Sequence, residues 1–185
     1  YALTRENGLA LHIDGARIMN AAVAQGVELR EITQYCDTLT ICLSKGLGAP
    51  IGSLLIGSKA FIHRANRWRK MTGGGMRQSG ILAAAAIYAL ENNVERLKDD
   101  HDNAQWLAEE LTKLGVEIAG PGAQTNVLYI RQSAELAEKM GPWMRERGVI
   151  ISAGPLTRVL THINISREDL QKVVALWQEF LHEHA

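Results

Sequence analysis

Short apolar runs alternate with longer amphipathic stretches in the first half of the chain. Short aliphatic runs predict buried strands, whereas apolar residues three or four positions apart predict helices. A strand, a helix and a second strand in this order are typical of a parallel sheet that helices cover on both faces. A third apolar run follows the second strand so closely that the two should pair as a hairpin. We expect strands at residues 9–14, 38–43 and 51–56, and helices at 17–25, 28–35, 59–71 and 78–94.

The pattern changes near residue 95, where a charged helical stretch begins and short alternating runs follow it. We expect helices at residues 95–114, 134–147 and 167–182, and strands at 116–118, 125–131, 149–152 and 158–165. Ser166, with Asp169 three positions later, resembles a capping box at the start of the last helix. This mixture predicts a small C-terminal α+β domain over residues 95–185. Residues 1–94 then form part of a larger α/β domain that includes a long connecting helix.

The opening residues indicate that this larger domain is incomplete. Residues 1–8 contain no methionine and have the pattern of a helix end stopped by Gly8, and a buried-type strand follows at once. A natural domain rarely starts in this way. We therefore expect the chain to be the later part of a longer protein.

Composition and charge argue against several classes of protein. The 185 residues carry 20 basic and 20 acidic side chains, so no overall charge favours a nucleic-acid or membrane partner. The basic helix at 59–71 lacks an aromatic platform or a recognised motif, and a solvated face or a subunit contact explains it better. No apolar run approaches the ~20 residues of a membrane span. Cys36 and Cys42 lie in or beside an apolar strand pattern, which favours reduced thiols and a cytoplasmic location.

Two residues with catalytic potential stand at the ends of predicted parallel strands. Asp14 ends the first strand, and Lys45 follows the second. In open α/β sheets, ligands bind in the crevice outside the carboxyl ends of the strands. Lys45 lies between two apolar runs, where we expect it to be buried, and a lysine removed from water can act as a nucleophile. An amine and a carboxylate at one sheet edge suit pyridoxal phosphate (PLP), whose pyridine nitrogen the carboxylate would keep protonated.

Arg17 and Ser44 can contribute to the same pocket. Arg17 lies three residues after Asp14, just inside the next predicted helix, and Ser44 can offer its hydroxyl to the cofactor phosphate. Each residue type also has a structural explanation, since a strand-end aspartate is often a helix N-cap and a strand-end lysine is usually a surface group. Gly46 and Gly48 are too few for a phosphate-loop motif, and no helix follows them. The combination, rather than any one residue, predicts PLP.

The histidines indicate no metal site. His12 shares a strand face with Asp14 and could approach the cofactor, although a packed strand histidine is the favoured explanation. His162 is open to the same two interpretations. The other candidates are expected to be solvated, and their spacing matches no set of metal ligands: His101, His182 and His184.

Three stretches of the sequence resemble the low-specificity L-threonine aldolases. They are residues 12–21 (HIDGARIMNA), 44–53 (SKGLGAPIGS) and 73–78 (GGGMRQ), and the resemblance runs in order over essentially the whole chain. That family consists of PLP enzymes with the aspartate aminotransferase fold, in the threonine aldolase and beta-eliminating lyase branch. The resemblance therefore implies an α/β fold. It would be the later part of an aminotransferase-like large domain with a mainly parallel sheet, followed by a small α+β domain.

The resemblance also implies a role for each of five residues. Lys45 matches the Schiff-base lysine, and Asp14 matches the partner of the pyridine nitrogen. Arg17 matches an arginine near the phenolic oxygen of the cofactor and the substrate. Arg158 matches the arginine that grips the substrate carboxylate, a role that suits a bidentate guanidinium. Arg77 matches a residue near the cofactor phosphate, in its own or a neighbouring subunit.

The family reaction is retro-aldol cleavage of L-threonine or L-allo-threonine to glycine and acetaldehyde. A base removes the β-hydroxyl proton, and the electrons of the Cα–Cβ bond flow into the cofactor ring. The family's phosphate loop and two pocket histidines belong to an upstream half outside this sequence, so we expect the chain alone to be inactive. The open alternatives are another PLP-dependent beta-eliminating lyase and a non-catalytic fragment. The resemblance further implies a homotetramer built from two dimers.

Overall fold

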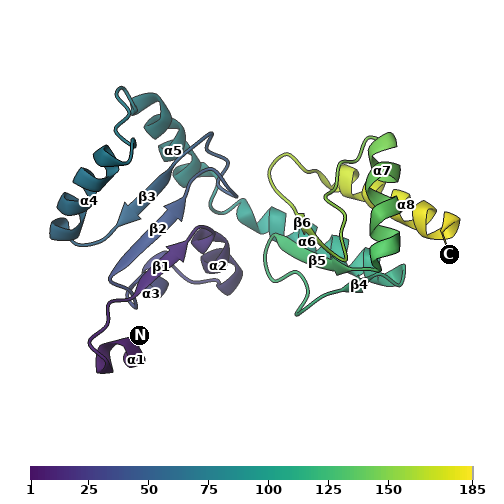
Figure 1. Cartoon of the computed structure of the whole chain (residues 1–185), viewed down its shortest axis with the longest axis horizontal. Coiled ribbons are helices and arrows are strands. Elements are labelled where there is room, and N and C mark those ends of the chain that lie inside the picture. Colours follow the sequence, from purple (N-terminus) through teal and green to yellow (C-terminus); the bar gives the residue numbers. More distant parts are fainter. Residues whose placement is uncertain (185) are drawn as a thin grey trace. The chain divides into compact units, whose positions relative to one another are not determined.

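The computed structural model describes residues 1–184, which form two compact units (Figure 1). The first unit, Tyr1–Leu97, contains a three-stranded sheet in the order β1–β2–β3. β1 (His12–Gly15) is parallel to β2 (Thr38–Cys42), and β2 is antiparallel to β3 (Ser53–Ile56). The predicted parallel pair and the predicted hairpin are both confirmed.

Five helices accompany this sheet: α1 (Ala2–Glu6), α2 (Ile18–Gln25), α3 (Leu29–Thr33), α4 (Lys59–Met71) and α5 (Gly80–Asn92). α2 ends at Gly26, whose φ of 65° is a left-handed conformation that glycine adopts without a Cβ clash. α4 begins after Ser58, whose Oγ accepts a hydrogen bond from the Phe61 N–H at 3.3 Å. Two small clusters of buried residues stabilise the unit: Ile18, Leu39 and Ile41, and Leu43, Leu47, Ala49, Ala86, Ala89 and Leu97.

The second unit begins at Lys98 and contains an antiparallel sheet in the order β4–β5–β6. Ser166 and Asp169 exchange two hydrogen bonds at the start of its last helix. Ser166 Oγ accepts from the Asp169 N–H at 3.1 Å, and Asp169 Oδ2 accepts from the Ser166 N–H at 2.9 Å. The predicted capping box is therefore confirmed. The elements of this unit are α6 (Leu97–Lys113, whose first residue belongs to the first unit), β4 (Glu117–Ile118), β5 (Val127–Arg131), α7 (Ala134–Glu146), β6 (Leu156–Leu160) and α8 (Arg167–Glu183).

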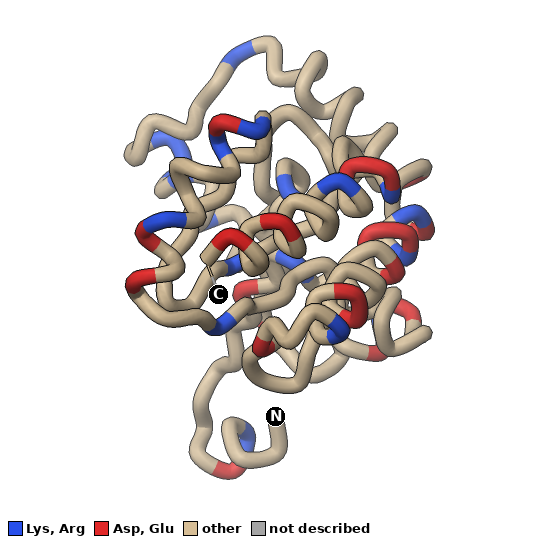
Figure 2. The backbone as a smooth tube through the Cα atoms, turned by 90° about the vertical axis from the view of Figure 1, so that its right-hand side faces the viewer, with Lys and Arg blue, Asp and Glu red and all other residues tan. Residues whose placement is uncertain are grey.

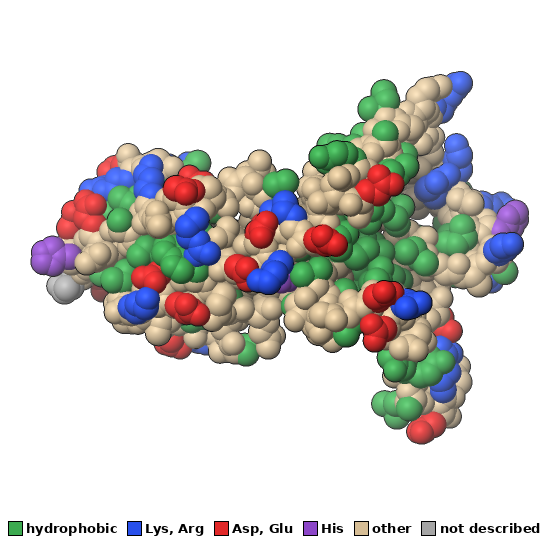
Figure 3. Space-filling view, turned by 180° about the vertical axis from the view of Figure 1, so that it is seen from behind, with side chains coloured by type: hydrophobic (Ala, Val, Ile, Leu, Met, Phe, Trp, Pro, Cys, Tyr) green, Lys and Arg blue, Asp and Glu red, His purple; other side chains and the backbone are tan. Residues whose placement is uncertain are grey.

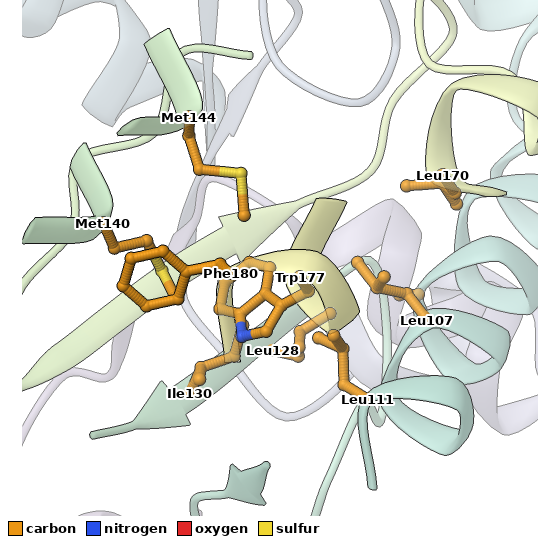
Figure 4. Packing of buried hydrophobic residues seen from close by; sticks show 10 residues of the cluster. Leu107, Leu111, Leu128, Ile130, Met140, Met144, Leu170, Trp177 and Phe180 are labelled. Carbon is orange, nitrogen blue, oxygen red and sulfur yellow. The ribbon is translucent and has the colours of Figure 1, made fainter. Parts of the chain in front are cut away.

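One hydrophobic cluster fills the second unit between its sheet and its helices (Figure 4). Leu128 and Ile130 of β5 are fully buried and belong to the same cluster as Trp177 and Phe180 of α8. Because side chains alternate along a strand, Tyr129 lies on the opposite face of this sheet, where its exposed fraction is 41%. The helices contribute the other buried members: Ala104, Leu107, Leu111, Met140, Met144 and Leu170.

Two strand predictions in the second unit are wrong. Residues 149–152 form no strand, and the Val149 N–H instead donates to the Met144 carbonyl at 3.0 Å and closes the end of α7. The last strand starts at Leu156 and ends at Leu160 rather than covering residues 158–165. The chain turns after β6, where the Ile165 N–H donates to the His162 carbonyl at 2.8 Å. Apolar residues in both segments pack against the core from loops, which imitates a strand pattern.

Basic and acidic residues are interspersed along the backbone (Figure 2). Among the helices of residues 1–184, none is long and apolar enough to cross a bilayer. The same residues contain no group of three or more His, Cys, Asp or Glu side chains placed to hold a metal ion.

Candidate functional site

The parallel pairing of β1 and β2 places Asp14 and the Lys45 segment at the same edge of the first sheet. Asp14 is the register partner of Thr40 and lies one residue before the end of β1. Lys45 lies three residues after β2 ends at Cys42. The carboxyl ends of parallel strands meet at one edge, so the topology brings an amine and a carboxylate to that edge.

Asp14 is exposed and does not cap the following helix. Its Oδ1 accepts a hydrogen bond from the Ala16 N–H at 3.2 Å, which closes a short local turn. The N-cap position of α2 belongs to Arg17, and no side chain caps that end. The alternative explanation of Asp14 as a helix N-cap is therefore wrong.

The Lys45 turn is anchored on its apolar neighbours. Leu43 and Leu47 are 4% and 2% exposed, and Asn93 Nδ2 donates to the Leu47 carbonyl at 2.7 Å. The Gly48 N–H donates to the Lys45 carbonyl at 2.9 Å and tightens the turn. The Lys45 side chain itself is exposed, so the expectation that it is buried is wrong. The apolar residues on both sides turn into the core, and the turn directs the charged amine away from it.

Both Asp14 and Lys45 are followed by a glycine that close packing requires. A Cβ at Gly15 would lie 2.5 Å from Leu39 Cδ1 and 2.5 Å from the Thr40 carbonyl oxygen. A Cβ at Gly46 would lie 2.9 Å from a Leu97 methyl group and 3.1 Å from Asn20 Oδ1. The backbone next to each candidate residue is therefore fixed against its neighbours, which orients the preceding side chain.

Substituting Gly46 with alanine should lower the free energy of unfolding by about 1–3 kcal/mol, because the added methyl group overpacks a filled site. Chemical denaturation followed by circular dichroism measures the loss. Gly80→Ala is the control, since no atom lies within 4 Å of the Cβ that it would add. Equal stability of the Gly46→Ala and Gly80→Ala variants would show that the Lys45 turn is not packed as described.

The structure brings two further predicted residues to this edge and leaves two elsewhere. Arg17 is half-buried and lines a small cavity together with Gly46 and Leu47, while Ser44 is exposed beside Lys45. Arg77 is exposed in the connection between α4 and α5, where its neighbour Gln78 has a positive φ of 51°. The fourth residue, Arg158, belongs to β6 of the second unit.

Arg158 lies on the face of the second sheet that points away from the core. Its strand neighbour Thr157 is fully buried, whereas Arg158 is exposed and has no ion-pair partner within residues 1–184. Arg131 shares this face, but its Nε lies 2.9 Å from Glu117 Oε1. The face therefore carries one arginine whose charge is already balanced and one whose charge is available to an anion. The sequence does not reveal this difference, because it depends on the register of β4 with β5.

Three histidines differ from expectation: His12, His101 and His184, the last of which is half-buried with its ring stacked on Phe180 at a centroid distance of 4.3 Å. His12 is exposed, and its Nδ1 lies 2.8 Å from Thr38 Oγ1, so the favoured explanation of a packed strand histidine is wrong. His162 Nδ1 accepts from the Asn164 N–H at 3.2 Å. His101 is half-buried rather than solvated, and burial lowers the pKa of its imidazole against the opposing effect of Asp100 and Asp102.

A cavity of about 760 Å³ lies between β3 and α4, away from all the predicted site residues. Its lining is mainly apolar, with Leu54, Leu55 and Trp68 among its residues, and Arg64 and Arg69 add two positive charges. No pattern in the sequence pointed to this cavity. It offers no amine or carboxylate, so the chemistry described above does not involve it.

A comparison with protein families identifies the group to which this arrangement belongs. A model of the beta-eliminating lyases matches residues 1–133, which include Asp14, Arg17 and Lys45. The chain belongs to the beta-eliminating lyase family. This membership confirms the branch that the sequence resemblance implied.

Individual members of the family and of the fold are also similar to the chain. The low specificity L-threonine aldolase of Escherichia coli strain K12 is 59% identical over 181 residues, which cover 98% of this chain and 54% of the relative. The chain thus spans about half the length of that relative. The structure of a Leishmania major threonine aldolase has a TM-score of 0.79 at 20% identity, over 97% of this chain and 54% of that one. A structure of SPT with PLP has a TM-score of 0.75 at 17% identity, and the match covers 98% of this chain and 50% of that one. These two likenesses confirm the predicted fold class.

Proposed function

We propose that the chain is part of a PLP-dependent aldehyde-lyase that cleaves L-threonine and L-allo-threonine to glycine and acetaldehyde. The observation that carries this proposal is the placement of Asp14 and Lys45 at one edge of a parallel strand pair. The 59% identity to the Escherichia coli low specificity L-threonine aldolase supports the choice of substrate. In this proposal the first unit is part of a large PLP-binding domain, and the second is the small domain.

The residues at the sheet edge fit PLP by their chemistry. Lys45 offers an exposed amine that can bind the cofactor aldehyde covalently, and Asp14 offers a carboxylate that can hold a proton at the pyridine nitrogen. Ser44 can donate its hydroxyl to the phosphate, and Arg77 would add positive charge to the same group. When bound, PLP supplies the electron sink that makes cleavage of the Cα–Cβ bond possible.

Arg158 would hold the substrate by its carboxylate. A guanidinium presents paired N–H donors that match the two oxygens of a carboxylate, and Arg158 has no acidic partner within residues 1–184 to compete with the substrate. Arg17 would approach the cofactor and the substrate from the α2 side of the sheet edge.

Exposed apolar side chains support a homo-oligomer, which we propose to be a tetramer of two dimers. Met76 and three residues of α5 project into solvent in the first unit, with exposed fractions of 65% for Met76, 82% for Ile81, 55% for Ile87 and 63% for Tyr88. Hydrophobic side chains gather on the surface of the same unit in Figure 3. Large exposed apolar patches mark protein interfaces. Free Cys36 and Cys42 agree with a reducing, cytoplasmic location.

Product analysis tests the proposed reaction. The chain, alone and co-expressed with the part of the Escherichia coli relative that the match does not cover, is incubated with PLP and L-threonine. We expect acetaldehyde and glycine in equal amounts from the co-expressed protein. Pyruvate and ammonia from a β-substituted amino acid, without acetaldehyde from threonine, would instead assign a beta-eliminating activity. If the co-expressed protein carries out neither reaction, the chain is not catalytic.

A further inference from the structure

We propose that Tyr129 is a second carboxylate-binding residue, whose phenol hydroxyl donates a hydrogen bond to the carboxylate that Arg158 holds. The inference rests on the proposed function, because it adds to the role given to Arg158. It starts from the register of the second sheet, in which Tyr129 of β5 and Arg158 of β6 are direct partners. Nothing in the sequence pattern links these two positions, which lie in different segments of the chain.

The hydrogen bonds of the ladder show which kind of pair this is. The Thr161 N–H donates to the Asn126 carbonyl at 3.1 Å, and the Gln132 N–H donates to the Pro155 carbonyl at 3.1 Å. Hydrogen-bonded and non-hydrogen-bonded pairs alternate along an antiparallel ladder. Each of these two bonds lies three positions from the Tyr129 pair, so that pair is of the non-hydrogen-bonded kind, in which the side chains are closest.

Both side chains leave the sheet on the face away from the core. Leu128 and Thr157, which flank them on the two strands, are fully buried on the other face. Within residues 1–184, neither the Tyr129 hydroxyl nor the Arg158 guanidinium has a hydrogen-bond or ion-pair partner. Next along the face comes the pair of Arg131 with Leu156, whose arginine is balanced by Glu117. The Tyr129 hydroxyl and the Arg158 guanidinium, both without a partner in the described residues, therefore belong to neighbouring side chains on one face of the sheet.

The combination suits a carboxylate better than either residue alone. A carboxylate has about four lone-pair sites, so it can accept both a guanidinium fork and a phenol hydroxyl. Directly opposed residues have Cβ atoms about 4.5–5.5 Å apart, which lets the two side chains converge on one anion. Hydrogen bonds to an ionised acceptor are stronger than those between neutral groups. A cavity of about 420 Å³ borders the pair on the Tyr129 side, where Tyr129, Arg131 and Leu156 are among its lining residues and Arg158 is not.

The test is a titration of the full 185-residue chain with glycine, without cofactor, followed by NMR of labelled tyrosine and arginine side chains. We expect the Arg158 Nε–H and Tyr129 ring signals to shift together and saturate at the same glycine concentration. Tyr129→Phe removes only the hydroxyl and should weaken glycine binding about 10-fold. Tyr35→Phe is the matched control, because Tyr35 is another exposed tyrosine, in the first unit, and the loss of its hydroxyl should leave glycine binding unchanged.

Two results separate this inference from the proposed function. If Arg158→Ala weakens glycine binding and Tyr129→Phe does not, the role of Tyr129 is wrong and that of Arg158 stands. If the unmodified chain shows no saturable shift at Arg158, then the role of Arg158 fails and that of Tyr129 fails with it. Weaker glycine binding in both the Arg158→Ala and the Tyr129→Phe variants, with no change in Tyr35→Phe, supports the proposal.

Discussion

Replacing Lys45 with alanine should reduce threonine cleavage by at least about 10³-fold, because the protein loses the amine that we propose binds the cofactor aldehyde. Acetaldehyde release from L-threonine at saturating PLP measures the effect in the co-expressed protein. Lys45→Arg should be equally inactive, since a guanidinium keeps the positive charge but stays protonated and is not a nucleophile. The pair of variants therefore separates covalent chemistry from electrostatic attraction.

Lys59→Ala is the matched control for Lys45→Ala. Lys59 is also an exposed lysine of the first unit, at the first position of α4, and it lies outside the sheet edge that carries Asp14. Its loss should leave cleavage unchanged within about twofold, as is usual for surface substitutions. If Lys45→Ala keeps more than a tenth of the activity, Lys45 does not have the role proposed for it.

Replacing Arg158 with alanine should lower kcat/KM for L-threonine about 10²-fold, mainly through KM. Removing one partner of a hydrogen-bonded charge pair costs about 2–5 kcal/mol. Arg158→Lys should recover part of the loss, because an ammonium supplies the charge without the planar fork. Steady-state kinetics with L-threonine and L-allo-threonine measure both variants.

Arg131→Ala is the control for Arg158→Ala, because it removes the same side chain from the same sheet face. Arg131 forms an exposed ion pair with Glu117, with side-chain exposures of 55% and 64%. Such pairs contribute about 0–1 kcal/mol. The Arg131 variant should therefore change kcat/KM less than fivefold. If Arg131→Ala lowered kcat/KM as much as Arg158→Ala does, then Arg158 would have no special role in binding the substrate carboxylate.

Local signals in the sequence predicted much of the fold. The α4 bounds of Lys59–Met71 match the expected residues 59–71, because Ser58 caps the start and a glycine run follows the end. The Ser166–Asp169 capping box formed as expected. Both features depend on residues within one helical turn, so the local pattern was sufficient.

Features set by contacts between distant segments could not be predicted in the same way. Residues 149–152 have an apolar pattern like that of a strand, but they pack on the core without a strand partner. The burial of His101 also depends on tertiary packing. The partnership of Tyr129 with Arg158 follows from the β5–β6 register, which links positions far apart in the sequence.

The exposure of the Lys45 side chain is another feature that the local sequence did not predict. The apolar runs on both sides correctly predicted that Leu43 and Leu47 are buried. They did not predict on which side of the turn the amine would lie, and the structure leaves it exposed. The positions of Asp14 and Lys45 at strand ends depended only on the order of the strands, and this part of the interpretation agrees with the parallel β1–β2 pair.

The most direct test of the central claim is to find where PLP attaches to the chain. The protein is incubated with PLP, treated with borohydride to reduce any imine, digested, and mapped by mass spectrometry. The proposal predicts one dominant adduct, on the peptide that contains Lys45. The Lys45→Ala variant should lose this adduct, and the Asp14→Ala variant should form less of it. An adduct spread over the exposed lysines in proportion to their accessibility, or no adduct on Lys45, would contradict it.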